Sequence, residues 1–223
     1  MAVSYPKTIE ERAKLYLHCM VEIRERLKIV RSLIDWKIQV LFVREMAYLQ
    51  LRHSCEVLAI ACLAAQGDFK TQRAFREEYR PSIIFKALRK QFPAFFPSST
   101  KRTSGDGRHH LEWTPNSGAY TEDQVVALWN HAGDRLHRLS VAKYLKKSFR
   151  PEDPAPDDLA THLAGMAKLL ECHTVALGDP SLPKNTLLQV ETEWEGQVRA
   201  IFLHLDKVAS TVTVQEWHAE LGE

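Results

Sequence analysis

Apolar residues follow the helical period through the first part of the chain. Residues 7–66 contain no Gly and no Pro and are rich in Leu, Ala, Glu, Arg and Lys, all of which favour helices. One helix of that length would extend for about 90 Å, so we expect a turn within residues 35–40. The second of the two helices, residues 40–65, is apolar on more than one side, which indicates a central position in a bundle.

Helix-start signals precede two of the expected helices. Thr8 is followed by Glu10 and Glu11, where negative charge suits a helix N-terminus, and Thr121 stands three positions before Gln124 as in a capping box. From residue 121 to residue 145 the apolar positions 125, 128, 129, 132, 136 and 139 share one helical face. Another helix is expected over residues 82–92, and the phenylalanines that follow predict a hydrophobic lid or, as the alternative, a base-stacking surface.

The rest of the chain divides into loops and a β-rich end. Residues 98–118 predict a basic loop, with Arg108–Trp113 as one short strand, and the Pro/Asp/Glu-rich residues 151–156 predict a boundary. A helix from Asp157 or Asp158 to Gly178 then leads to a hairpin of residues 187–194 and 197–205, with a third strand at 208–214. We therefore expect a mainly α multi-helix bundle, residues 1–150, with a small C-terminal α+β appendage, residues 151–223.

Charge is distributed unevenly along the sequence. Residues 1–69 hold 10 Lys+Arg and 8 Asp+Glu, residues 70–150 hold 16 and 7, and residues 151–223 hold 4 and 13. A basic middle favours an anionic partner, such as nucleic acid or an acidic protein. The equal alternative is that the basic and acidic regions face each other, within one chain or across an oligomer.

Cysteine usage and hydropathy bear on location. The four cysteines lie in helix-like segments without a CxxC pair, which predicts reduced, buried thiols in a cytoplasmic protein. The sequence has no uncharged apolar run of eighteen residues and no apolar segment ahead of the first charges, so we expect neither a membrane span nor a secretory signal. His109 and His110 are adjacent and lack a second cluster at ligand spacing, so we expect no metal and no cofactor.

Two polar groups on expected helices are candidates for chemistry. In LRHSCE, Arg52, His53 and Glu56 stand on neighbouring rows of the second helix, as a structural ion pair that fixes register or as the lining of a polar site. On the helix that begins after Thr121, a polar stripe contains Asn130, Gly133, Asp134 and His137. A histidine beside an acid and arginines fits acid–base chemistry on a phosphodiester, and the alternative is a histidine satisfied within an interface.

The long helices, the LRHSCE segment and the GDRLH segment resemble HEPN-type four-helix domains over residues 8–150. The resemblance implies a metal-independent RNase of the toxin or phage-defence type, or a degenerate relative that binds RNA, acting as a homodimer. His137 would be the family histidine. The family's arginine position, five to seven residues earlier, holds Asn130, His131 and Ala132, so Arg52 from the facing helix would have to substitute.

Two hypotheses follow for the role of the protein. In the first, His137 is the acid/base, Asp134 orients it, Asn130 supports it, and Arg52 or Arg138 holds the phosphate. In the second, the protein is a non-enzymatic interaction module that binds nucleic acid or an acidic protein through its basic middle. The basic side chains expected to contact nucleic acid are Lys101, Arg102, Arg108, Arg138, Lys143, Lys146 and Lys147.

Overall fold

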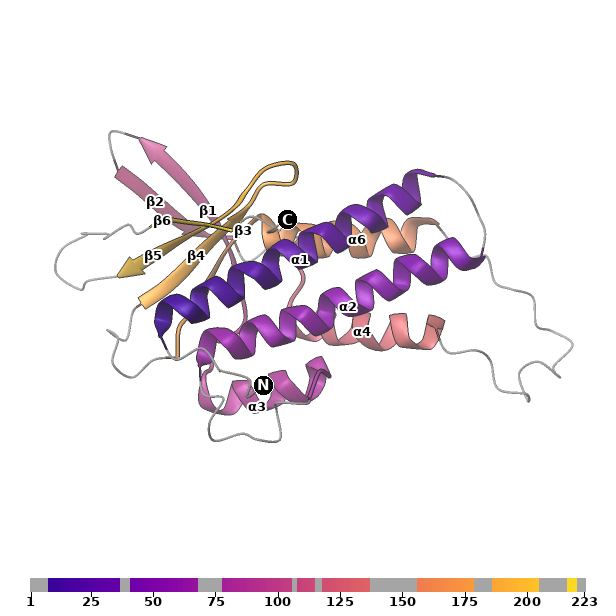
Figure 1. Ribbon diagram of the computed structural model, residues 1–223, viewed down its shortest axis with the longest axis horizontal. Coiled ribbons are helices and arrows are strands. Elements are labelled where there is room, and N and C mark those ends of the chain that lie inside the picture. Colours follow the sequence, from indigo (N-terminus) through magenta and orange to yellow (C-terminus); the bar gives the residue numbers. More distant parts are fainter. Residues whose placement is uncertain are drawn as a thin grey trace, which may run out of the picture.

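Two long helices run side by side through the molecule (Figure 1). The computed structural model describes residues 8–36, 41–67, 78–105, 108–114, 118–136, 156–178, 186–204 and 216–219. Helix α1, Ile9–Asp35, is followed by helix α2, Leu41–Gln66, so the expected turn is confirmed. Thr8 and Glu11 form a capping box at the start of α1, and Gly67 follows α2 with a φ of 69°, a conformation that suits glycine at a helix end.

Three shorter helices pack around α2. They are α3, Pro81–Gln91, α4, Glu122–Leu136, and α6, Pro156–Glu171, and α6 also lies against α1. The capping box that the sequence predicts for α4 is present, because Thr121 and Gln124 bond to each other's backbone N–H. The rings of Phe85, Phe95 and Phe96 pack together with centroids 5.5–6.1 Å apart, and Phe95 is buried. Phe92 and Phe96 are partly buried against the core, so Phe92, Phe95 and Phe96 pack as the predicted hydrophobic lid requires.

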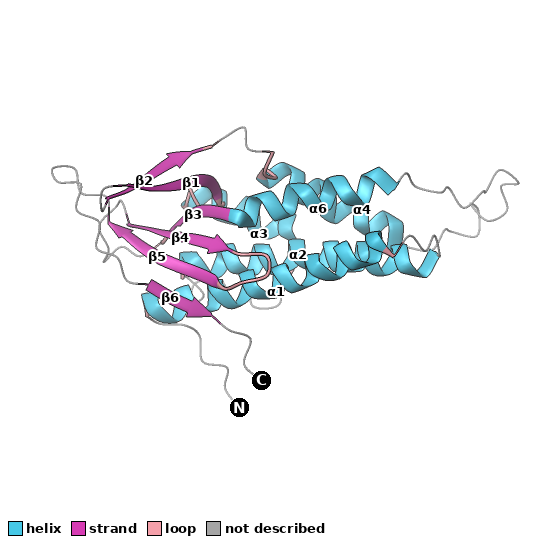
Figure 2. Cartoon of the chain, turned by 90° about the horizontal axis from the view of Figure 1, so that it is seen from above, coloured by secondary structure: helices cyan, strands magenta, loops and turns pink. Residues whose placement is uncertain are grey.

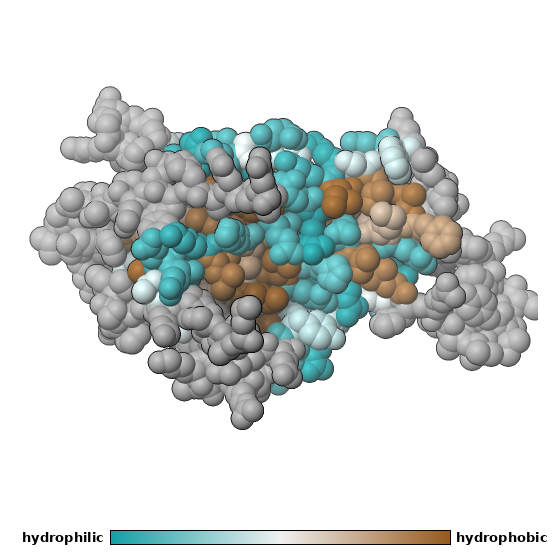
Figure 3. All heavy atoms as spheres, in the orientation of Figure 1, coloured by the Kyte–Doolittle hydropathy of each residue, from teal (hydrophilic) through white to brown (hydrophobic). Residues whose placement is uncertain are grey.

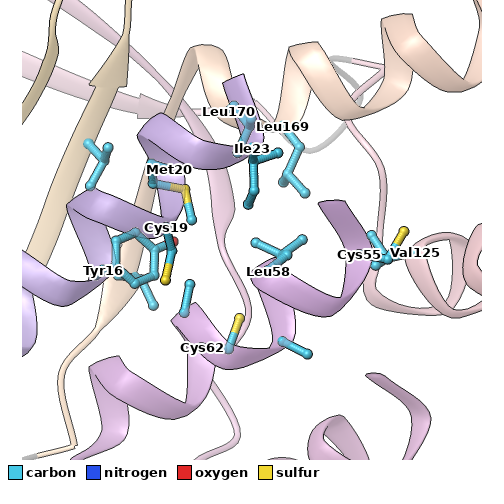
Figure 4. Packing of buried hydrophobic residues seen from close by; sticks show 14 of the residues in the cluster. Tyr16, Cys19, Met20, Ile23, Cys55, Leu58, Cys62, Val125, Leu169 and Leu170 are labelled. Atoms are coloured by element: carbon cyan, nitrogen blue, oxygen red, sulfur yellow. The ribbon is translucent and has the colours of Figure 1, made fainter. Parts of the chain in front are cut away.

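One continuous core joins the helices to the sheet. Buried side chains of α1, α2, α4 and α6 meet between the helices (Figure 4), and buried residues of the strands belong to the same cluster. The labelled members are Tyr16, Cys19, Met20, Ile23, Cys55, Leu58, Cys62, Val125, Leu169 and Leu170. Burial raises the pKa of the three cysteine thiols in this core, so they stay protonated at neutral pH. All four cysteines are free thiols.

A six-stranded antiparallel sheet lies at one end of the helices (Figure 2). The strand order is β2-β1-β3-β4-β5-β6. The bounds are Ser98–Gly105 for β1, Arg108–Trp113 for β2, Cys172–Ala176 for β3, Thr186–Thr192 for β4, Val198–His204 for β5 and Glu216–Ala219 for β6. The mainly α class, with an α+β C-terminal part, is confirmed. So are the strand at Arg108–Trp113 and the hairpin formed by β4 and β5.

Two expectations about the ends of elements were wrong. Residues 98–105, expected as loop, form a strand that pairs with β2 on one side and with β3 on the other. The helix expected to reach Gly178 ends at Glu171, and residues 172–176 continue as β3 between β1 and β4. In both cases ladder hydrogen bonds on the two edges of the strand override the local pattern, and one of the two partners, β3 for β1 and β1 for β3, is distant in the sequence.

The expected boundary after residue 150 lies in a segment outside the described residues. Strands from both sides of it share the sheet, since β1 hydrogen-bonds to β3. The third strand expected at residues 208–214 also lies outside the described part. None of the described helices combines the length and apolar character that crossing a membrane requires.

The outer face of the two long helices carries exposed apolar side chains. Figure 3 shows apolar surface over this face of the molecule. The large exposed members on α1 and α2, including the residue that caps α1, are Ile29, Trp36, Phe42, Met46, Leu49 and Ile60. A surface of this kind suits contact with another protein, and the expected homodimer stays a prediction.

A buried histidine makes the stability of the fold depend on pH. His173 of β3 is fully buried, and its Nε2 lies 2.9 Å from the hydroxyl of Tyr16 on α1. Burial, partly opposed by a backbone hydrogen bond at Leu170, lowers the pKa of His173 to about 4. In the unfolded chain the same group titrates near 6.5, so the unfolded state binds the extra proton between these two values.

We expect the free energy of unfolding to be highest above pH 6.5 and to fall as the pH drops towards 4. His173 accounts for about 3 kcal/mol of that loss. Urea unfolding of wild type and His173→Gln at pH 7.0, 5.5 and 4.5 measures it. The variant should lose less stability over this range, and parallel pH profiles for the two proteins would refute the assignment.

Candidate functional site

Five polar side chains meet where α2, α4 and α6 come together. His131 lies on α4, Asp158 and His162 lie one turn apart on α6, Tyr48 comes from the middle of α2, and Tyr120 precedes α4. We call this group the His–Asp–His cluster. Its histidine and carboxylate side chains are partly exposed, at 34% for His131, 33% for Asp158 and 16% for His162. The cluster is therefore reachable from solvent.

Both histidines of the cluster contact the carboxylate of Asp158. Nε2 of His131 lies 3.0 Å from Oδ2 of Asp158, and Nε2 of His162 lies 3.1 Å from Oδ1. The second contact has ion-pair distance without hydrogen-bond geometry, so the buried Nε2 of His162 has no hydrogen-bond partner among the described residues. One donor atom from each residue falls within 4.8 Å of the other two.

Two tyrosine hydroxyls form hydrogen bonds with Asp158 and His162. The hydroxyl of Tyr48 donates to Oδ2 of Asp158 at 3.1 Å, and the hydroxyl of Tyr120 lies 2.7 Å from Nδ1 of His162. Gly165 allows the second contact, because a Cβ there would come within 2.0 Å of the Tyr120 ring. The Tyr120 backbone N–H also donates to the Gly165 carbonyl at 3.1 Å. The ring of Tyr120 is thus fixed against α6 with its hydroxyl on His162.

Burial and neighbouring charges set the protonation of Asp158, His162 and Tyr48 near neutral pH. Burial favours a higher pKa for Asp158, but the Tyr48 hydrogen bond and the two histidines outweigh it and lower the pKa. Burial lowers the pKa of His162, assisted by His131 and opposed by Asp158. Burial and the charge of Asp158 raise the pKa of Tyr48 to about 12. Asp158 is therefore ionised, His162 neutral and Tyr48 protonated.

This donor set fits a divalent transition metal. Ligand atoms about 2.0–2.1 Å from a tetrahedral ion stand roughly 3.3–3.4 Å apart, close to the 3.0 and 3.1 Å separations here. Two imidazoles and one carboxylate suit Zn²⁺ or Fe²⁺. Metal-bound histidines and carboxylates are oriented by outer hydrogen bonds, the role that Tyr120 and Tyr48 would take. Although the sequence predicted no metal, the geometry fits one.

The predicted site residue Arg52 lies in a different contact, between α2 and α4. Its Nε donates to Oε1 of Glu56 at 3.2 Å, and its guanidinium lies 4.4 Å from the ring centroid of Trp129. Glu56 also accepts from the Trp129 indole at 2.9 Å and contacts Nδ1 of His53 at 3.0 Å. Gly133 leaves room for Arg52, since a Cβ there would lie 2.5 Å from Nη1. This arrangement joins the two helices through a carboxylate whose side chain is only 12% exposed.

The other predicted catalytic residues are not brought to Arg52. Asn130 and Asp134 are exposed on α4, whereas Ala132 and Gly133 of the same helix are buried. No hydrogen bond or ion pair among the described residues joins Arg52 to Asn130 or Asp134. His137 lies outside the described residues, so its predicted role stays a prediction.

The predicted nucleic-acid contacts are described only in part. Lys101 is exposed on β1, and Nε of Arg102 pairs with Oε1 of Glu191 at 2.9 Å. Both line a groove of about 1480 Å³ between α1, α6 and the sheet. The groove has as many carboxylates as cations, namely Asp35, Glu112, Glu171, Glu191 and Glu193 beside Arg24, Arg31, Lys101, Arg102 and Lys168. The side chain of Arg108, and all of Arg138, Lys143, Lys146 and Lys147, lie outside the described part.

The His–Asp–His cluster could not be predicted from the sequence, because its two histidines and Asp158 come from two helices that are separated in the chain. Asp158 and His162 stand four apart on an expected helix, which places them on one face. That signal was visible, as was His131 on the preceding expected helix. Residues 137–155 separate the two pieces, and nothing in the linear pattern showed that their faces meet.

Comparison of the chain with protein-family models gives no match, and neither the curated proteins nor the solved structures that were searched contain one. The resemblance to HEPN-type domains therefore stays a prediction.

Removal of the Glu56 carboxylate should destabilise the fold. Its side chain is 12% exposed and serves three partners on two helices, so Glu56→Ala should cost about 3 kcal/mol of unfolding free energy. The matched control is Glu22→Ala, which removes an exposed i,i+4 pair with Arg26 and should cost less than about 1 kcal/mol. Equal losses in urea unfolding would show that the buried carboxylate has no special role.

Proposed function

We propose that the protein is a metal-dependent hydrolase whose divalent ion is held by His131, Asp158 and His162. The observation that carries the proposal is the convergence of one donor atom from each of these residues within 4.8 Å. Three protein ligands with solvent access leave a coordination position for water or substrate, which is the arrangement of catalytic rather than structural zinc sites. Closed structural sites use four protein ligands.

A divalent ion in this position would supply Lewis acidity, which brings the pKa of a bound water from 15.7 to about 7. In hydrolysis the hydroxide part of water joins the electrophilic centre, the bond to the leaving group breaks, and the proton of the water ends on the leaving group. Tyr48 would hold the carboxylate of Asp158, and Tyr120 would accept from Nδ1 of His162 so that its Nε2 lone pair faces the ion. The helices of the bundle keep these side chains in place.

The competing explanation is that the cluster only ties α4 and α6 to α2. Direct binding separates the two explanations. Isothermal titration with Zn²⁺ should give one equivalent bound to wild type, with the dissociation constant raised at least about 100-fold in His131→Ala, Asp158→Asn and His162→Ala. His53→Ala, on the exposed side of α2, is the matched control and should bind as wild type does. Failure of wild type to bind, or equal binding by His162→Ala, would refute the metal site.

The expectation of RNA as substrate rests on the basic residues 70–150 and on the HEPN resemblance. The chain segment that connects α4 to α6 contains Arg138, Lys143, Lys146, Lys147 and Arg150, so that this charge is close in sequence to both helices of the cluster. Among the described residues, Arg52 and Arg102 already pair with glutamates. RNA cleavage therefore stands as a second candidate function.

An RNA cleavage assay distinguishes the two mechanisms. The metal-dependent mechanism predicts that EDTA and His162→Ala each abolish cleavage, whereas His137→Ala retains it. The metal-independent, HEPN-like mechanism predicts that cleavage persists in EDTA and is lost in His137→Ala. Absence of cleavage in every protein and buffer would remove RNA as the substrate of either.

A further inference from the structure

We propose that Arg135 and Arg44 form an anion site beside the His–Asp–His cluster that binds the phosphate group of a phosphate-ester substrate. The inference rests on the proposed function for the catalytic role of the metal. The anion site itself depends only on the placement of the two arginines.

Both arginines lie one helical turn from a residue of the cluster. Arg135 follows His131 by four residues on α4, and Arg44 precedes Tyr48 by four residues on α2, so each pair shares a helix face. The charges of Arg135 and Arg44 both act on the hydroxyl of Tyr48, where they oppose the rise in its pKa that burial and Asp158 cause. Two cations from different helices thus lie near enough for their charges to act on the hydroxyl that contacts Asp158.

The guanidinium of Arg135 has N–H donors that no other described residue engages. Its side chain is half-buried, yet it forms no hydrogen bond or ion pair with another described residue. Arg52 and Arg102, by contrast, each pair with a glutamate. A cation in the last turn of α4 is favoured by the helix dipole, but that interaction does not engage the five N–H donors of a guanidinium. A half-buried guanidinium with free donors beside a ligand-type cluster indicates a place for an anion.

The charge and shape of the neighbourhood favour phosphate. One carboxylate and two guanidinium groups give the site a net positive charge, to which a bound divalent ion would add. Helix α6 begins at Pro156, two residues before Asp158, which places the positive end of its dipole at the cluster as well. A tetrahedral phosphate can contact a metal and a guanidinium through different oxygens, and guanidinium groups match phosphate oxygens with paired N–H donors.

In the reaction, the oxygen of water bonds to phosphorus, the bond between phosphorus and the ester oxygen breaks, and the proton of the water ends on the departing alcohol. The guanidinium groups of Arg135 and Arg44 offset the negative charge on the phosphoryl oxygens, where it is spread in the transition state. This gives Arg135 a role in substrate binding without a role in metal binding.

Titration of inorganic phosphate, followed by ³¹P NMR, tests the site in the metal-free and the Zn²⁺-loaded protein. Arg135→Gln should raise the phosphate dissociation constant at least about tenfold in both forms, and Arg135→Lys should recover part of the loss. Lys86→Gln, which removes an exposed cation on α3, is the charge-matched control and should change it less than about twofold. Zn²⁺ affinity of Arg135→Gln should equal that of wild type.

The outcomes separate the anion site from the proposed function. If wild type binds no Zn²⁺ but binds phosphate in an Arg135-dependent way, the metal proposal fails and the anion site stands. Phosphate affinity that is unchanged in Arg135→Gln, or absent from wild type in both forms, overturns the anion site whatever the zinc result. With the Zn²⁺-loaded protein, p-nitrophenyl phosphate and bis-p-nitrophenyl phosphate then distinguish a monoester from a diester substrate, and hydrolysis of either must weaken in Arg135→Gln.

Discussion

The burial of α2 on several sides is the constraint on which the rest of the structure depends. Packed between α1, α3, α4 and α6, this helix cannot leave its polar groups unbonded at low cost. Three of these groups consequently bond to neighbouring elements. Tyr48 donates to Asp158 at the start of α6, Glu56 accepts from Trp129 of α4, and the amide of Gln66 donates to the Ala176 carbonyl of β3 at 2.7 Å.

The cluster is a consequence of this arrangement. Tyr48 holds the first turn of α6, and the α2–α4 contact at Glu56 sets where His131 stands along α4. The two histidines therefore reach the same carboxylate, although neither belongs to the central helix. The same packing brings the charges of Arg44 and Arg135 within range of the Tyr48 hydroxyl. Hydrogen bonds that the polar groups Tyr48 and Glu56 of α2 form therefore also position the partly exposed side chains of the His–Asp–His cluster.

Local signals in the sequence were enough for most of the helices and for the β4–β5 hairpin, and insufficient for β1 and β3. Capping residues at Thr8 and Thr121 and the absence of Gly and Pro from residues 7–66 predicted α1, α2 and α4, because these signals come from neighbours in the sequence. The Ser- and Thr-rich residues 98–105 resemble a loop, yet residues 100–105 pair with the adjacent strand β2, and residues 98 and 99 pair with β3, some seventy residues later. In the same way the sequence showed the Arg52–Glu56 pair, which one helix brings together, but not the meeting of His131 with Asp158.

X-ray absorption at the zinc edge, on the protein loaded with one equivalent of Zn²⁺, tests the central claim most directly. The account predicts a first shell of nitrogen and oxygen only, at about 2.0–2.1 Å, with the outer-ring scattering of two imidazoles and without sulfur. A sulfur neighbour at about 2.3 Å would place the ion at a cysteine. A spectrum of fully hydrated zinc would mean that His131, Asp158 and His162 hold no metal, and either result would contradict the account.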